Sequence, residues 1–208
     1  MGDKQKQVRR ELSGWGNYPK AECAFYRPEN MPDLAVTLQQ HEGSVIARGL
    51  GRAYGDAALN EAGVVSTERL DRFLTFDEEK GVLKAQAGLE LQQVLDVVIP
   101  HGWMMPVIPG TKHVSLGAMV ACDVHGKNHA KRGTIGQHVL EITLRTAADE
   151  VVTCSPKTQK ELFFATLGGM GLTGVIEAVK MQLMPISSLS LRAGSKRVKR
   201  LQEMFDAF

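Results

Sequence analysis

Hydrophobic and polar positions follow short helical and strand patterns along most of the chain. Apolar residues at helical spacing, with glycine or proline close beyond several of them, predict helices at 33–41, 88–99, 116–122, 160–167 and 198–208. Short apolar runs between polar turns predict strands at 44–48, 64–67, 72–77, 82–87, 140–146, 151–154 and 175–184. The strands at 140–146 and 151–154 form a predicted β-hairpin, and a second structural unit is predicted to begin after Gly88.

Composition narrows the class of protein. The 208 residues include 25 basic and 23 acidic ones and 43% hydrophobic ones, which excludes a disordered chain and argues against nucleic acid as the main partner. Five basic residues between Arg192 and Arg200 are either the solvated face of a C-terminal helix or a contact for phosphate or anionic lipid.

The cellular location of the protein is predicted from its apolar stretches, which polar residues and prolines interrupt, and from its cysteines. No export signal is visible, and the most apolar stretch, 94–109, contains Asp96 and Pro100, so no transmembrane segment is expected. The 3 cysteines are far apart, which indicates a reducing compartment. We therefore expect a soluble, cytoplasmic protein, with association at a membrane surface left open.

A glycine-rich loop at 48–56 follows a predicted buried strand. Gly49, Gly51 and Gly55 allow successive backbone N–H groups to converge on one oxyanion, and Arg48 or Arg52 can add positive charge. The loop can therefore hold a pyrophosphate, with a simple tight turn as the alternative. It is not the dinucleotide fingerprint GxGxxG, because the last gap differs and no helix follows.

A second segment, 106–129, also carries candidate functional residues. Ser115 is the predicted N-cap of a helix in which Gly117 and Ala118 leave room for a flat neighbour. Lys127 lies in a polar loop between a glycine and an asparagine, so it is either functional or a solvated surface lysine. Cys122 is either a thiol nucleophile or an inert buried cysteine.

The histidines of this segment allow one more hypothesis. Asp123, His125 and His129 could serve a metal-dependent hydrolase. Gly126 and Asn128 argue against this site, because they break the helix that would bring the histidines together.

A family resemblance rests on four segments taken in order, which are RGLGRAYGD, PVIPGTKHVSLGAMVACDVHGKNH, GTIGQHV and LFFATLGGMGLTGVI. They resemble the PCMH-type FAD-binding domain of the vanillyl-alcohol oxidase family, and within it the decaprenylphosphoryl-ribose 2′-oxidase branch. The resemblance covers about 21–186. Sugar-lactone oxidases such as arabinonolactone oxidase share the domain but are less similar in the HGKNH stretch.

The resemblance implies an α+β fold of two subdomains with FAD between them. The first FAD-binding subdomain would span 21–88, with a small mixed sheet and a pyrophosphate loop at 47–57. The second would span 89–186, with a larger antiparallel sheet and helices. Residues 187–208 would begin a substrate domain, because family members continue well beyond this length and carry their catalytic base there.

The same resemblance assigns residues to the cofactor and the substrate. Contacts to the FAD phosphates would come from Ala47, Arg48, Gly49, Leu50, Gly51, Arg52, Ala53, Tyr54, Gly55, Asp56 and Ala57. The ribityl and ring region would be formed by Gly110, Ser115, Leu116, Gly117, Ala118, Cys122, Asp123, Val124 and His125, with Ile176 at the adenine end. Lys127 and His125 would be the catalytic residues that orient the sugar, and no metal ligand is assigned.

Two positions depart from the family pattern. Ala53 stands where a serine is usual, and the lost hydroxyl donor is expected to weaken phosphate binding by about 1 kcal/mol. Covalently flavinylated relatives have a histidine near the position of Arg52, so FAD is expected to be bound noncovalently.

The implied activity is oxidation of a secondary alcohol of a small-molecule or lipid-linked sugar, such as a precursor of cell-wall arabinan, with hydride transfer to FAD. A reductase partner is compatible with this hypothesis. The alternatives are a sugar-lactone oxidase and an FAD-binding fragment without turnover.

Overall fold

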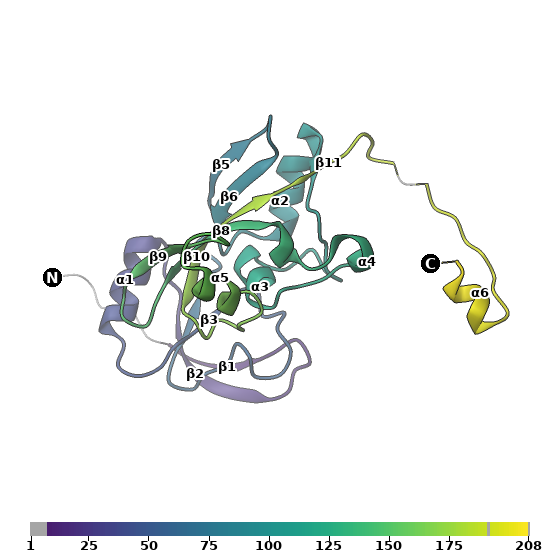
Figure 1. Cartoon of the computed structure of the whole chain (residues 1–208). Helices are drawn as coiled ribbons and strands as arrows, with labels where there is room; N and C mark the ends of the chain where they lie inside the picture. The colour runs from purple at the N-terminus through teal and green to yellow at the C-terminus, as the bar shows by residue number, and fades with distance from the viewer. Residues whose placement is uncertain (1–7, 191, 208) are drawn as a thin grey trace.

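A small mixed sheet forms the first part of the protein in the computed structural model, which describes residues 8–190 and 192–207 (Figure 1). Its strands are β1 (Val8–Ser13), β2 (Lys20–Tyr26), β4 (Val64–Ser66) and β3 (Ile46–Arg48), in that order across the sheet. β1 runs antiparallel to β2, whereas β4 is parallel to both of its neighbours. The helix α1 (Met31–Gln40) connects β2 to β3 and begins at Asn30, whose side chain accepts a hydrogen bond from the Asp33 amide at 2.9 Å.

A larger antiparallel sheet forms the second part. Its strands are β5 (Phe73–Asp77), β6 (Val82–Gln86), β10 (Val175–Gln182), β8 (Val139–Arg145) and β9 (Val151–Cys154), so β10 occupies the middle. Leu83 and Ala85 of β6 point into the core, while Lys84 between them forms an ion pair of 2.8 Å with Glu141 of β8. The predicted α+β fold, with a small mixed sheet and a larger antiparallel one, is confirmed.

The strands of the two sheets are not separated at residues 88/89, where the subdomain boundary is predicted, and that boundary stays a prediction. β5 and β6 were expected in the first subdomain, but β6 pairs with β10 from Val82↔Gln182 to Gln86↔Ala178. The amide of Ala87 continues this pairing with a hydrogen bond of 2.9 Å to the carbonyl of Glu177. The first sheet in turn includes β1, which lies before the predicted start at residue 21.

The helices agree with the predicted pattern in position and differ at their ends. α2 (Leu91–Val98) begins with a capping box between Glu90 and Gln93, and α5 (Lys160–Thr166) buries Phe163. α3 (Leu116–Ala121) has Ser115 as its N-cap, as predicted. The sequence pattern did not predict the strands β1 and β2, nor did it predict the short elements η1 (Ile99–His101), β7 (Trp103–Met104), α4 (His129–Arg132) and η2 (Ile135–His138). It also did not separate β11 (Met184–Pro185) from the predicted strand at 175–184.

The two sheets share an apolar seam. Leu34 of α1, Val65 of β4 and Val175 of β10 pack together in one buried cluster. The larger cluster lies between the second sheet and the helices α2, α3 and α5. The seam therefore joins the first sheet to the middle strand of the second.

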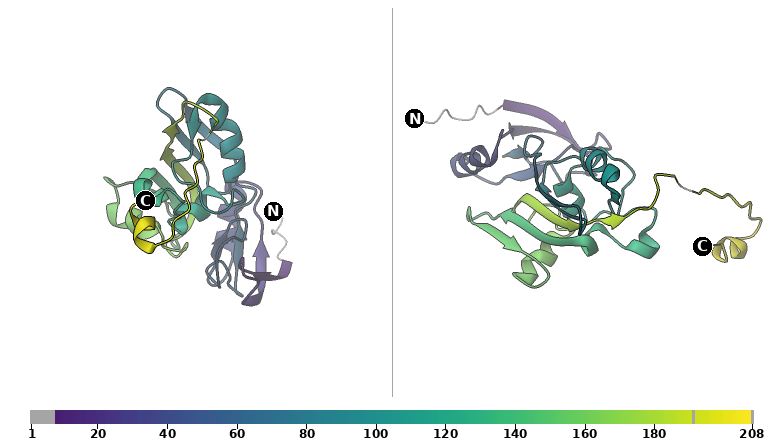
Figure 2. Two further views of the ribbon diagram at one scale, coloured as in Figure 1. Left: turned by 90° about the vertical axis from the view of Figure 1, so that its right-hand side faces the viewer. Right: turned by 90° about the horizontal axis from the view of Figure 1, so that it is seen from above.

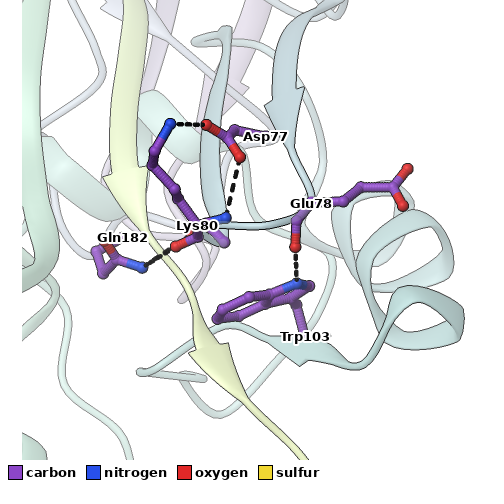
Figure 3. A network of polar contacts seen from close by, with 6 residues as sticks. Asp77, Glu78, Lys80, Trp103 and Gln182 are labelled. Atoms are coloured by element: carbon purple, nitrogen blue, oxygen red, sulfur yellow. Dashed lines mark hydrogen bonds and ion pairs between the residues drawn. The ribbon is translucent and has the colours of Figure 1, made fainter.

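A polar corner fixes β10 and β7 to the turn between β5 and β6 (Figure 3). The indole N–H of Trp103 donates to the carbonyl of Glu78 at 2.8 Å, and the side-chain amide of Gln182 donates to the carbonyl of Lys80 at 2.8 Å. Asp77 accepts from both the backbone and the side chain of Lys80, each at 2.9 Å. These bonds position the chain where it leaves the second sheet.

The C-terminal segment lies apart from both sheets. Figure 1 and the right-hand view of Figure 2 show residues 192–207 extending away from them and ending in α6 (Leu201–Phe205). The helix predicted at 198–208 is shorter within the described residues, and its last residue, 208, lies outside them. Within the described part of the chain, no helix is long and apolar enough to cross a membrane.

Candidate functional site

A continuous cleft lies between the loop after β3, the helix α3 and the glycine-rich loop before β10. Its narrow end is lined mainly by small residues, which are Ala47, Gly49, Gly51, Ala58, Thr67, Ala87, Gly117, Ala121, Gly171, Gly174 and Ile176. Its wider end, with a volume of about 560 Å³, is lined by Trp15, Tyr54, Pro109, Gly110, Thr111, Val114, Val124 and His125. Both ends share Arg52, Ala53, Ala57, Ala118, Cys122 and Met170. The wide end alone has the size of a small-molecule site.

Arg48 ties the glycine-rich loop to the rest of the first sheet. Its Nη2 donates to the carbonyl of Ser13 at 2.7 Å, and its Nη1 donates to the carbonyl of Ala58 at 3.3 Å. Burial lowers the pKa of this guanidinium from its ordinary value. The side chain of Arg48 therefore holds the loop and does not line the cleft.

Arg52 has a different environment and is among the residues that line both ends of the cleft. Its Nη1 donates to the carbonyl of Leu50 at 2.5 Å, and its guanidinium lies 5.1 Å from the ring centroid of Trp15. Its Nε is buried and has no hydrogen-bond partner in the protein. Gln92 Oε1 and Thr146 Oγ1 are also buried without a partner, but Arg52 Nε is the one of these three atoms whose side chain lines the cleft, so the guanidinium is a candidate donor for a ligand with acceptor oxygens.

The close packing of three backbone segments forms the narrow end. A Cβ atom on Gly117 would lie 2.8 Å from the Cβ of Ala87, and one on Gly49 would lie 3.6 Å from the Cβ of Ala118 and even closer to the side chain of Ser115. Gly51 has φ +70°, a conformation that other residues rarely adopt. Glycine is thus required here by the packing of the loop on α3 and by the turn itself.

Ser115 and Leu116 support this wall from behind. The Ser115 hydroxyl accepts a hydrogen bond from the amide of Ala118 at 3.4 Å, and Leu116 is fully buried in the large core. These two residues of the predicted cofactor set therefore cap and anchor α3.

The segment after α3 forms the wall of the wider end. Burial raises the pKa of the Cys122 thiol, so the thiol stays protonated at neutral pH. Asp123 accepts a hydrogen bond from the amide of Gly136 at 2.9 Å, which connects it to η2 and not to the cleft. The ring of His125 lies 5.5 Å from that of His129, whereas Lys127 is exposed and is not among the residues that line the cleft.

The structure therefore divides the residues predicted to bind FAD or substrate. Those that line the cleft are Ala47, Gly49, Gly51, Arg52, Ala53, Tyr54, Ala57, Gly110, Gly117, Ala118, Cys122, Val124, His125 and Ile176. Those that do not line it are Arg48, Leu50, Gly55, Asp56, Ser115, Leu116, Asp123 and Lys127. The individual contacts to a cofactor stay predictions.

Several lining residues were not identified from the sequence. Trp15 comes from the turn after β1, and Met170, Gly171 and Gly174 come from the loop before β10. The run of glycines from 168 to 174 was a signal for a loop that approaches a ligand closely. Trp15 had no comparable signal, since a single tryptophan in a polar segment has many roles.

The alternative metal site gains no support from the geometry. Within residues 8–190 and 192–207, no group of three or more His, Cys, Asp or Glu side chains lies close enough together to hold a metal ion. The Asp123 carboxylate instead accepts a hydrogen bond from the Gly136 amide.

Comparisons with known proteins agree with the geometry of the cleft. The family model described as FAD binding domain matches residues 24–155. The chain is 39% identical over 183 residues to decaprenylphosphoryl-beta-D-ribose oxidase of Mycolicibacterium smegmatis, covering 85% of this chain and 40% of that protein. It is 28% identical to the mitochondrial L-galactono-1,4-lactone dehydrogenase of Arabidopsis thaliana, covering 82% of this chain and 28% of that protein.

A further relative is a putative D-arabinono-1,4-lactone oxidase of Neurospora crassa, which is 24% identical over 92% of this chain and 35% of that protein. The chain thus spans 40% or less of the length of these three relatives. The family model covers most of the two walls of the cleft, including the loop after β3 and all of α3. The chain therefore belongs to the FAD-binding-domain family.

Proposed function

We propose that this chain is the FAD-binding part of an oxidoreductase that oxidises a secondary alcohol of a sugar. The observation that carries the proposal is the cleft, in which small residues form the narrow end and the buried Nε of Arg52 has no acceptor. The greater identity to the decaprenylphosphoryl-ribose oxidase, 39% against 28% for the lactone dehydrogenase, favours a ribose-like, lipid-linked substrate.

The residues of the cleft fit FAD in shape and in chemistry. A flat, elongated dinucleotide requires walls without bulky side chains, and alanine and glycine line most of the narrow end. A diphosphate requires N–H donors, which the glycine-rich loop and Arg52 can supply. The buried Nε of Arg52 would then gain its missing acceptor.

The roles of the residues follow from their places in the cleft. The loop at 47–57 and Arg52 would hold the diphosphate, while Gly117 and Ala118 would leave room for the groups that follow. Ile176 would pack against the adenine end, and Cys122 and Val124 would form the wall beside the flavin ring.

When bound, FAD supplies a ring that accepts a hydride from the alcohol carbon. His125, which lines the wider end of the cleft, and the exposed Lys127, two residues further along the chain, would orient the sugar hydroxyls. Both residues act on the substrate in this proposal, so their loss is expected to affect turnover and not FAD content.

One titration tests the cofactor assignment. The purified chain is expected to bind added FAD with a saturable change in flavin absorbance. After acid precipitation the flavin should be in the supernatant, because Arg52 stands where a covalent histidine link would be needed. Flavin that remains with the pellet would contradict noncovalent binding, and no saturable binding would contradict the proposal itself.

A comparison of substrates tests the reaction. The whole protein, of which this chain corresponds to the FAD-binding part, is expected to reduce its flavin faster with a lipid-linked ribose than with aldonolactones. Faster reduction by a lactone would favour the sugar-lactone oxidase alternative, and reduction by neither would favour an FAD-binding fragment without turnover. Contact with a separate substrate domain, a reductase partner and action in the cytoplasm or at a membrane surface stay predictions.

A further inference from the structure

The turn after β1 contacts the glycine-rich loop although it lies outside the residues 24–155 that the family model matches. The amide of Trp15 donates to the carbonyl of Ala53 at 2.8 Å, and the carbonyl of Ser13 accepts from Arg48 at 2.7 Å. A Cβ atom on Gly14 would lie 2.5 Å from the carbonyl oxygen of Gly55, so the two backbones touch. Residues 13–15 therefore pack against the glycine-rich loop at several points between Arg48 and Gly55.

The ring of Trp15 adds a side-chain contact at the wall of the cleft. The guanidinium carbon of Arg52 lies 5.1 Å from the ring centroid, which is the geometry of a cation–π pair. The Leu50 carbonyl accepts from Nη1 of the same guanidinium, and Nε remains without a partner. Two contacts thus fix the guanidinium while leaving N–H groups for another acceptor.

The exposure of Trp15 is unusual for so large an apolar side chain. Its relative exposure is 55%, although burying a tryptophan is strongly favourable. Both Trp15 and Arg52 line the wider end of the cleft. Packing in the protein core therefore does not explain the position of Trp15, whereas a role at the cleft does.

We propose that Trp15 is a positioning residue for Arg52, which it holds at the wall of the cleft so that the free N–H groups donate to the diphosphate of FAD. The proposal rests on FAD as the ligand and adds a residue from outside the matched family domain. Without the ring, the guanidinium keeps one carbonyl contact and becomes free to rotate toward solvent. FAD would then have to order it on binding, at a cost in affinity.

The test compares FAD with riboflavin, which lacks the phosphates. Trp15→Ala is expected to weaken FAD binding about threefold to tenfold, which corresponds to the loss of one cation–π contact. Riboflavin binding should change less than FAD binding, because riboflavin lacks the diphosphate to which Arg52 would donate, whereas a direct contact of Trp15 with the flavin ring would weaken both ligands equally. Trp15→Phe should keep most of the FAD affinity, since a phenyl ring retains the contact with the guanidinium. Circular dichroism and the unfolding midpoint would show that the variants fold.

Two further variants connect the effect to Arg52. Arg52→Met should weaken FAD binding, and adding Trp15→Ala to it should cause little further loss, because the cation that the ring contacts is already gone. Trp103→Phe is the matched control, since Trp103 lies in the polar corner of Figure 3 and lines neither end of the cleft.

Each outcome decides between the hypotheses. Three results would overturn the role of Trp15 and leave FAD binding itself in place. They are an unchanged FAD affinity in Trp15→Ala, equal losses of affinity for FAD and riboflavin, and fully additive losses in the double variant. No FAD binding by the unaltered chain would overturn the proposed function together with this inference.

Discussion

Replacing Arg145 by methionine is expected to lower the free energy of unfolding by about 3 kcal/mol. The Nε of Arg145 donates to Glu177 at 2.8 Å and its Nη1 donates to Asp149 at 2.7 Å, and the side chains of Arg145 and Glu177 are only 12% and 10% exposed. Breaking a buried pair costs about 3 to 5 kcal/mol because it leaves a charge without a partner. The lower end applies here, since the side chain of Asp149 is 33% exposed and retains water.

Urea unfolding followed by circular dichroism measures this loss by linear extrapolation. The double variant Arg145→Met with Glu177→Gln should recover about 1 kcal/mol or more, because no buried carboxylate is then left unpaired. Lys20→Met is the control, since the ion pair of Lys20 with Glu11 has side chains 57% and 68% exposed and should contribute less than about 1 kcal/mol. A loss in Arg145→Met no larger than in the control, or no recovery in the double variant, would refute the reasoning.

Three further results are expected from single positions. The hydrogen bond from the Gln39 side chain and the contact with Arg145 lower the pKa of Asp149 below its ordinary 3.8. The free energy of unfolding should therefore fall as the pH drops below about 4. Asp149→Asn should make this fall smaller in acid unfolding curves. Gly110 lines the wider end of the cleft, so Gly110→Val should reduce FAD binding, and circular dichroism should stay normal because a Cβ there meets no atom within 4 Å. Gly194→Val is the control, since a Cβ at Gly194 also meets no atom and the residue does not line the cleft, and it should change neither measurement. Cys122 should be alkylated before the two fully buried cysteines, Cys23 and Cys154, as peptide mass spectrometry would show. Its alkylation should be slow at neutral pH because burial raises the pKa of its thiol, and slower still with FAD bound, because Cys122 lines the cleft.

The sequence predicted best those elements whose burial pattern arises within one segment. The helix α2 was predicted within 88–99 because apolar residues recur there at helical spacing, and in the structure Leu91, Val94 and Val98 are buried. The hairpin of β8 and β9 was predicted because its strands are adjacent in sequence and need only a short turn. Local periodicity and local pairing were sufficient in both cases.

Features that depend on distant segments could not be predicted in the same way. The pairing of β6 with β10 involves partners far apart in sequence, so nothing near Gln86 indicates which sheet β6 joins. The pattern of β1, with its exposed arginines, resembles a polar loop because this edge strand buries little of either face. Arg48 was a candidate phosphate ligand, but only the structure shows that its guanidinium is used by the carbonyls of Ser13 and Ala58.

The central place of β10 also determines the order in which the chain can fold. β5 and β6 form one local hairpin and β8 and β9 another, but both need β10, the last of the five strands in sequence, to become one sheet. A ribosome needs about 5 to 20 seconds to add the ~100 residues from Val82 to its partner Gln182. During that time the β5–β6 hairpin exposes a strand edge that can pair with another nascent chain, and the β8–β9 hairpin does the same once Cys154 has been added. A truncation before Val175 would remove the middle of the sheet and make those two exposed edges permanent.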